Sequence, residues 1–171
     1  KNIKSSLTSS YSYGSFNTHQ WNVNGSYQFK NSLILKGAGF YNYSDNSYKV
    51  WGNDIGYYEA DGRTSFGHTA KRFNDAYESK GGKIDLGFTN KKWTDQFFIG
   101  GIYSDQMKQL QHGVSMRMVY GKRASLQNSK VGLITYSKNN LLVEGLSLNI
   151  NASLSSLERN NIDTSGVLYD W

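Results

Sequence analysis

The sequence predicts an all-β chain folded as an antiparallel up-and-down meander. Three observations lead to this fold class: apolar residues recur at every second position, the 171 residues contain no proline, and the connecting segments alternate between short and long. A chain of this length would carry about eight prolines at the usual frequency of ~5%. Proline cannot donate a ladder hydrogen bond, so its complete absence is typical of a backbone committed to strand pairing.

The alternation of apolar and polar residues defines the strands. It is clearest from Trp21 to Phe29 and from Leu146 to Leu154, where one face is apolar and the other polar. Segments of this length match the ~9–11 residues that a tilted strand needs to cross a bilayer. Weaker copies of the pattern, and two segments that are apolar on both faces, complete a set of about seven predicted strands: 5–13, 20–29, 33–43, 83–89, 96–103, 129–137 and 146–157.

The connectors between these strands are of two alternating kinds. Residues 30–32, 90–95 and 138–145 are short and polar, whereas 44–82 and 105–128 are long and rich in Gly, Asn, Asp, Tyr and Lys. The brief turn 14–19 is the one interruption of the long set. Every second connection of a meander lies at the same end of the sheet, so the two long loops share one end. Outer-membrane barrels have this asymmetry, with short periplasmic turns and long outward loops. We therefore expect the sheet to span the outer membrane.

The apolar faces are predicted to contact lipid, and the polar faces a hydrated interior or a partner inside it. Tyr and Trp gather near both ends of the strands. Membrane interfaces favour such rings because the ring is half buried while its polar tip stays wet. The residues predicted to face lipid are Trp21, Val23, Tyr27, Phe29, Leu146, Leu148, Ile150 and Leu154.

Charge and composition exclude several other classes. The net charge is +6, but the lysines and arginines lie mostly at segment ends, in no run longer than two. This leaves no face that could follow a phosphate backbone, so a nucleic-acid partner is not expected. The absence of cysteine rules out disulfides and thiolate zinc sites. No apolar stretch approaches the ~18 residues of a membrane helix.

Two stretches carry a family resemblance. Residues 11–29, which begin Tyr-Ser-Tyr-Gly-Ser-Phe-Asn, and residues 40–53, which begin Phe-Tyr-Asn-Tyr-Ser-Asp, resemble early barrel strands of TonB-dependent outer-membrane receptors of the Bacteroidetes type. The segment Gln-His-Gly-Val-Ser-Met-Arg-Met-Val-Tyr-Gly-Lys, within 105–122, is similar to a later loop of the same family.

The resemblance implies a barrel of about 22 strands, filled by an N-terminal plug, in the outer membrane of a Gram-negative cell. Such a receptor imports a siderophore, vitamin or oligosaccharide with energy from a TonB-type complex. The implied partners are the lipid bilayer and lipopolysaccharide, the plug domain and remaining strands, that energising complex and a surface lipoprotein. This sequence departs from the family in lacking a plug and a TonB box. We therefore expect 1–171 to be the first third of a barrel, which cannot transport alone.

Two alternatives remain. The segment 164–171 ends in aromatic residues, as does the terminal signal of outer-membrane barrels, so an eighth strand there would complete a small barrel with a structural or adhesive role. The other alternative is a soluble all-β binding module whose apolar faces pack on one another.

The candidate ligand site is the loop 44–82. No catalytic constellation is present, and an enzyme, a metal and a cofactor are not expected, because His19, His68 and His112 lie in connectors without metal-ligand spacing. Exposed aromatics mixed with charges suit stacking on a sugar, a planar siderophore or a partner protein. Self-packing of this long loop is the alternative. The residues predicted to bind ligand are Tyr48, Trp51, Tyr57, Tyr58, Arg63 and Phe66.

Overall fold

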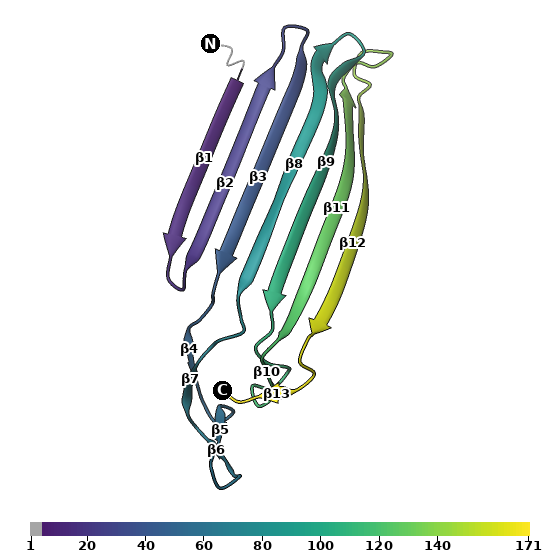
Figure 1. Ribbon diagram of the computed structural model, residues 1–171. Helices are drawn as coiled ribbons and strands as arrows, with labels where there is room; N and C mark the ends of the chain where they lie inside the picture. The colour runs from purple at the N-terminus through teal and green to yellow at the C-terminus, as the bar shows by residue number, and fades with distance from the viewer. Residues whose placement is uncertain (1–4) are drawn as a thin grey trace.

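The computed structural model describes residues 5–171, which form one large antiparallel sheet with small hairpins at one end (Figure 1). Its seven strands lie side by side in chain order, so the predicted all-β meander is confirmed. They are, in spatial order, β1 (Ser5–Gly14), β2 (Thr18–Gln28), β3 (Leu33–Ser44), β8 (Tyr77–Lys91), β9 (Thr94–Gln109), β11 (Arg123–Lys138) and β12 (Leu148–Asp163).

Short strands in the long connectors form three two-stranded ladders. They pair β4 (Lys49–Trp51) with β7 (Thr69–Lys71), β5 (Gly56–Tyr58) with β6 (Thr64–Phe66), and β10 (Val119–Tyr120) with β13 (Leu168–Tyr169). Figure 1 shows these ladders together at one end of the sheet, while three tight turns lie at the other end. The expected sorting of long and short connectors is therefore present, except for the short turn 15–17 between β1 and β2, which lies at the end that carries the long connectors.

Four strands are longer than the apolar alternation indicated. The predicted 83–89 lies within β8, which begins at Tyr77, and 96–103 within β9, which continues to Gln109. The predicted 129–137 lies within β11 and 146–157 largely within β12, which extends to Asp163. The loops 44–82 and 105–128 shorten accordingly to 45–76 and 110–122. The added residues are largely polar on both faces, as where Lys80 pairs with Asp105, so the backbone ladder continues after the side-chain alternation stops.

Three residues predicted to lie in strands, Phe29, Leu146 and Ser147, lie just outside them. Leu146 precedes β12, and its N–H donates to the Val143 carbonyl at 3.2 Å. Phe29 follows β2, and its N–H donates to the Leu33 carbonyl at 2.8 Å. Both predictions continued a period of two by one or two residues beyond the end of the strand. Apolar residues continue at these positions, but β2 ends before Phe29 and β12 begins after Leu146.

The strand register gives the sheet one apolar and one polar face. A single row of directly paired residues crosses six strands, and because paired residues share a face, all its side chains lie on the same side. That row is Tyr27, Leu35, Leu86, Ile99, Ile134 and Ala152. Trp21, Val23, Leu148, Ile150 and Leu154 belong to the same apolar face. The alternating residues Asn22, Asn24 and Asn151 belong to the other.

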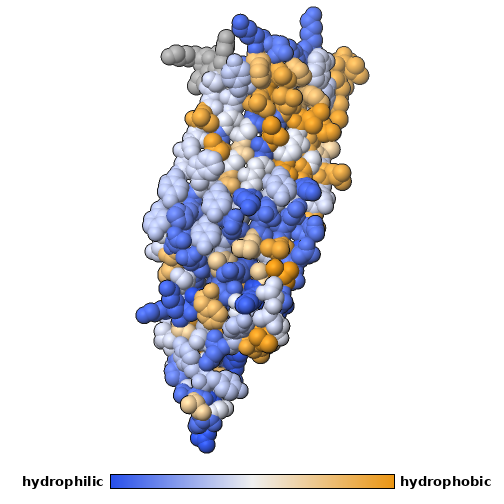
Figure 2. Space-filling view, in the orientation of Figure 1, coloured by the Kyte–Doolittle hydropathy of each residue, from blue (hydrophilic) through white to orange (hydrophobic). Residues whose placement is uncertain are grey.

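Neither face of the described sheet is covered by a second layer (Figure 1). Large side chains of the apolar face are therefore exposed, with Leu7 at 78%, Ile84 at 59% and Leu154 at 82% of their full area. Figure 2 shows the most apolar side chains gathered toward the tight-turn end and hydrophilic ones over the half that carries the long loops. A continuous apolar face of this extent marks a protein or membrane contact, because soluble monomers rarely expose one.

Two glycines on opposite faces give a matched test of packing. A Cβ added at Gly87 would overlap the Phe97 carbonyl oxygen and come within 2.6 Å of the Phe98 ring, whereas at Gly37 the nearest atom is 3.9 Å away. We expect Gly87→Ala to lower the free energy of unfolding by about 1–3 kcal/mol. Gly37→Ala is expected to be neutral or slightly stabilising, because glycine is unfavourable within a strand. Urea unfolding of both variants measures the difference, and equal losses would contradict this packing.

Candidate functional site

The predicted ligand loop lies in a layer built from residues 45–76, 110–122 and 164–171, called here the loop layer. Val50, Ile55 and Ala70 form its buried cluster, with Tyr57, Met116 and Trp171 packed against them. Ile55 is completely buried. Within residues 5–171 this is the one hydrophobic cluster of buried side chains. The loop is therefore self-packed, and any ligand would bind to a folded surface rather than to an extended, unpacked loop.

Two of the predicted ligand residues are engaged in structural contacts. The half-buried Tyr57 donates its hydroxyl hydrogen bond to the Thr69 carbonyl at 3.1 Å. The Tyr48 ring lies 5.0 Å from the Arg72 guanidinium carbon, in cation–π geometry. These contacts hold the loop layer together, so the ring faces of Tyr48 and Tyr57 are not jointly presented to a ligand.

The other four predicted residues divide into two pairs. Trp51 is 77% exposed and the Arg63 side chain is 87% exposed, and neither lines a described cavity with the others. Tyr58 and Phe66, which come from the paired strands β5 and β6, do line one cavity together. The structure therefore brings together only this pair of the six predicted residues.

This cavity, of about 190 Å³, lies between the β5–β6 ladder and the β10–β13 ladder. Its walls come from three segments that are far apart in the sequence. The aromatic and charged side chains that line it, and that could stack on or hydrogen-bond to a ligand, include Tyr58, Phe66, Arg117, Tyr169, Asp170 and Trp171. A volume below the ~300–1,000 Å³ of a drug-sized site suits a single ring-sized group.

Charged side chains tie the cavity walls together. Arg117 Nε donates to Asp54 Oδ1 at 2.8 Å, and its guanidinium carbon lies 4.7 Å from the centre of the Phe66 ring. Asp170 Oδ2 accepts a hydrogen bond from the Tyr58 backbone N–H at 2.8 Å. Aromatic faces beside carboxylates and a guanidinium can hold a polar ring by stacking and hydrogen bonding.

No local sequence pattern points to Arg117 and Asp170 as cavity residues. Their partners Asp54 and Tyr58 are 63 and 112 positions away. Such pairings depend on how the connectors fold over one another, which spacing along the chain does not reveal. The aromatic residues near 171 favour an eighth barrel strand in the alternative interpretation, but Leu168–Tyr169 pair with Val119–Tyr120 and not with the large sheet.

An acidic turn leads into the cavity wall. The Asp163 carboxylate accepts hydrogen bonds from the backbone N–H groups of Gly166 and Ser165, at 3.0 and 3.1 Å. These donors hold the pKa of Asp163 below its usual range. The turn is therefore favoured at pH values above the ordinary range of an unfolded carboxyl group, and this contribution is lost as the pH falls through the lowered pKa.

A buried polar cluster fixes the loop layer where it joins β9 and β11. The Asn74 side-chain amide donates to the carbonyls of Leu110, Tyr120 and Arg123, at 3.0, 3.1 and 3.2 Å. Gln111, which is 1% exposed, accepts hydrogen bonds from the Phe73 and Asn74 backbone N–H groups through Oε1. Buried polar groups of this kind specify one arrangement, because any other leaves them unpaired.

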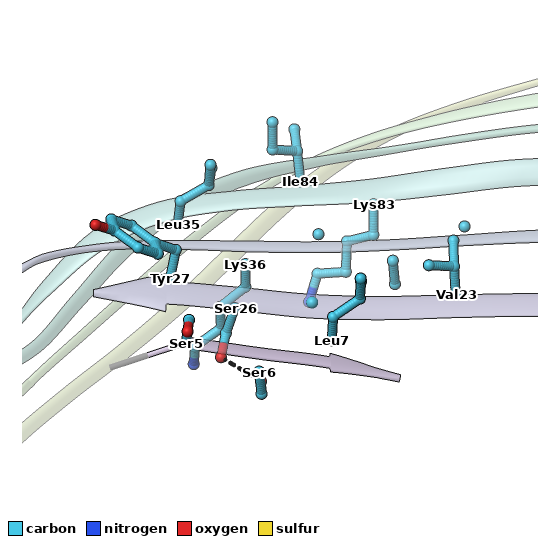
Figure 3. A pocket seen from close by; sticks show the side chains of 14 residues that line it. Ser5, Ser6, Leu7, Val23, Ser26, Tyr27, Leu35, Lys36, Lys83 and Ile84 are labelled. Atoms are coloured by element: carbon cyan, nitrogen blue, oxygen red, sulfur yellow. Dashed lines mark hydrogen bonds between the residues drawn. The ribbon is translucent and has the colours of Figure 1, made fainter. Parts of the chain in front are cut away.

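A second, larger hollow lies on the apolar face of β1, β2, β3 and β8 (Figure 3). It exists because Gly25, Gly37 and Gly39 lack side chains there. Figure 3 shows Leu35 and Ile84 on the hollow's side of the sheet and Lys83 directed to the opposite side. Without converging polar groups this hollow lacks the chemistry of a specific ligand site, and it belongs to the apolar face.

In the part of the chain that the structure describes, no group of three His, Asp or Glu side chains could hold a metal ion. The same residues include no helix with the length and hydropathy needed to cross a membrane. No protein-family model matches the chain, and no curated protein or solved structure matches it.

Proposed function

We propose that this chain is a section of the wall of an outer-membrane β-barrel, belonging to a TonB-dependent nutrient receptor whose surface loops capture the ligand. The observation that carries the proposal is the shape of the apolar area on the apolar face of the sheet. This area is a band that crosses the strands obliquely.

The slope of the band follows from the register. Starting at Leu154 on β12, the row of paired residues across the sheet arrives at Leu7 on β1. On β12 the band ends at Leu154, since Ser156 and Glu158 follow on that face, whereas on β1 it continues to Tyr13, six residues beyond Leu7. On β9 the band ends at an intermediate height, at Tyr103, which is two residues beyond the Leu154 row, and Asp105 follows on that face.

The shift converts to a strand tilt. Six residues correspond to about 20 Å along a strand, and six strand-to-strand steps to about 29 Å across the sheet, which gives a slope of about 35°. Strands of membrane barrels tilt by about 35–45° from the membrane normal. A horizontal layer of lipid would therefore meet these strands along the observed band. In a soluble sheet packed on another layer, no planar boundary between lipid and water would impose such a slope.

The free edges of the sheet support a larger barrel. Within residues 5–171, β1 and β12 each pair on one side only. A membrane strand cannot leave its N–H and C=O groups unpaired in hydrocarbon, so further strands are expected on both edges. The proposed eighth strand at the end of the chain does not supply them, because Leu168–Tyr169 pairs with Val119–Tyr120 and not with the sheet.

The polar face suits a hydrated barrel interior that holds a plug. Lys83 and Asp85 form an ion pair at 3.0 Å, and Lys36 Nζ lies 4.2 Å from the centre of the Phe98 ring. These groups lie behind the apolar band, near its middle. Charges at this depth need water or a polar partner, since burying them unpaired is costly. A plug domain, a TonB-type complex and a surface lipoprotein are the partners that this function implies.

Within this proposal the loop-layer cavity beside Tyr58 and Phe66 contributes to ligand capture on the outer side. Its size favours one ring of a siderophore, vitamin or oligosaccharide rather than a whole ligand. The other contacts would come from parts of the receptor beyond these strands.

Flotation with lipid tests the membrane assignment. We expect the chain, as part of the full receptor refolded from urea, to float with phosphatidylcholine vesicles and to become resistant to protease over the band residues. A parallel sample in aqueous buffer is expected to aggregate. A monodisperse, folded species in buffer without lipid or detergent would overturn the proposal and support the soluble binding module.

A further inference from the structure

Arg72 and His112 join the two long connectors side chain to side chain. Arg72 follows β7, and His112 follows β9, forty positions later in the chain. Arg72 Nη2 and His112 Nε2 are 2.5 Å apart, and Arg72 also pairs with Asp75 through Nη1. The Arg72 side chain is only 10% exposed. This contact is therefore a part-buried link within the loop layer.

The hydrogen bonds of His112 define which ring nitrogen carries the proton. Nδ1 lies 2.8 Å from the Gly113 carbonyl oxygen, which can only accept, so Nδ1 must donate. The guanidinium of Arg72 can only donate, so Nε2 must accept with its lone pair. The link therefore requires a neutral imidazole protonated on Nδ1.

Arg72 belongs to a charged cluster beside His112. Arg72 and Lys108 both pair with Asp75, the latter through Lys108 Nζ and Asp75 Oδ1 at 2.6 Å, so the group already holds two cations and one carboxylate. Other titratable groups near this cluster are Tyr48 beside Arg72, and Tyr120 beside Arg123. Asp170 precedes Trp171, whose ring lies near His112.

We propose that His112 is a proton-sensitive clasp on the loop layer: the neutral ring ties Arg72 to residues 111–113, and the protonated ring releases it. A proton taken from water onto Nε2 places two donors and two positive charges against each other. The His112 ring is also 6.2 Å from the Trp171 ring, which lines the cavity. Release of the clasp therefore loosens the cavity wall. The clasp rests on these contacts alone and does not depend on the proposed membrane function.

Amide hydrogen exchange tests the clasp on the full chain, refolded in detergent. We expect the protection factors of 110–121, corrected for intrinsic rates, to fall by about tenfold or more between pH 7.5 and pH 5.0, as expected for loss of a hydrogen bond to a charged group. In His112→Gln, the amide oxygen can accept from Arg72 and the amide nitrogen can donate to Gly113. This variant cannot be protonated, so its protection is expected to stay constant.

His68→Gln is the matched control. His68 also forms a hydrogen bond through Nε2, with Ser65 Oγ, but it lies between β6 and β7 in the other long connector. This variant is expected to keep the acid response of 110–121. Exchange of the imidazole C2 hydrogen in the unmodified chain reports directly when His112 gains its proton, and therefore gives an answer even where a variant fails to fold. Loosening while His112 is still neutral, an equal response in His112→Gln, or unchanged protection at pH 5.0 would each overturn the clasp.

Discussion

Placing an arginine at Val23 is expected to destabilise the lipid-embedded protein by about 2–4 kcal/mol, the cost of a cation at the middle of the lipid face of a membrane barrel. Val23 lies on the apolar face of β2, between Trp21 and Tyr27, and its register partners are Ser9 and Gly39. The free energy of unfolding in urea, measured in phospholipid vesicles for Val23→Arg and the unmodified chain, gives this difference.

Asn24→Arg is the matched control for this substitution. Asn24 is the next residue of the same strand, is exposed, and lies on the polar face. An arginine there meets water or a polar partner, so we expect a change below about 0.5 kcal/mol, as at ordinary surface positions. Losses of equal size at positions 23 and 24 would contradict the assignment of the two faces.

Removing the side-chain amide of Asn74 is expected to destabilise the loop layer by about 3 kcal/mol. Asn74→Ala removes this donor from the carbonyls of Leu110, Tyr120 and Arg123, of which Arg123 keeps a bond from the Leu110 N–H. Each buried group that loses its partner costs about 1–3 kcal/mol. The effect is local, so native-state hydrogen exchange of residues 110–122 is the appropriate measurement, with strand amides of β2 and β3 as the internal reference.

Asn53→Ala provides the comparison within the same loop layer, because Asn53 is exposed. We expect it to change the exchange of these amides by less than the equivalent of about 0.5 kcal/mol. If Asn74→Ala behaves like Asn53→Ala, the cluster around Asn74 does not hold the two connectors together.

The sheet was predictable from the sequence where side chains alternate cleanly. Strand 20–29 carries Trp21 and Val23 against Asn22 and Asn24, and the structure places β2 at Thr18–Gln28. The outer halves of β8 and β9 were missed because Lys80 and Asp105 face each other there, where the backbone ladder holds polar residues. The alternation of side chains shows which face of a strand meets apolar surroundings, but it does not show where the strand ends.

The oblique course of the apolar band could not be predicted from the sequence, although each of its apolar residues could be identified there. Leu7, Tyr13 and Leu154 each fit an apolar alternation, but their relative heights appear only when the register between strands is known. Register is set by the turns and by the pairing of all seven strands together.

The candidate site was less predictable than the sheet for a related reason. Composition identified the aromatic loop and two of the residues that line the cavity, Tyr58 and Phe66. It also favoured Trp51 and Arg63, which are exposed outside that cavity. The opposite wall comes from the distant segments around Arg117 and Asp170, which tertiary packing alone brings near.

The most direct test of the membrane-wall account compares two positions in one row of the sheet. The register links Tyr11 on β1, strand by strand, to Glu158 on β12, on the same face. A flat or soluble sheet would place the two at the same depth. A sheet tilted by about 35° places Tyr11 in the lipid layer and Glu158 above it.

The 171 residues contain no cysteine, so Tyr11→Cys and Glu158→Cys can each be spin-labelled alone in vesicle-embedded protein. The relative accessibility of the label to oxygen and to a water-soluble nickel complex reports its depth. The account predicts that the label at 11 is accessible to oxygen and shielded from nickel, and that the label at 158 is accessible to nickel. Equal accessibility at the two positions, whether to water or to lipid, would contradict it.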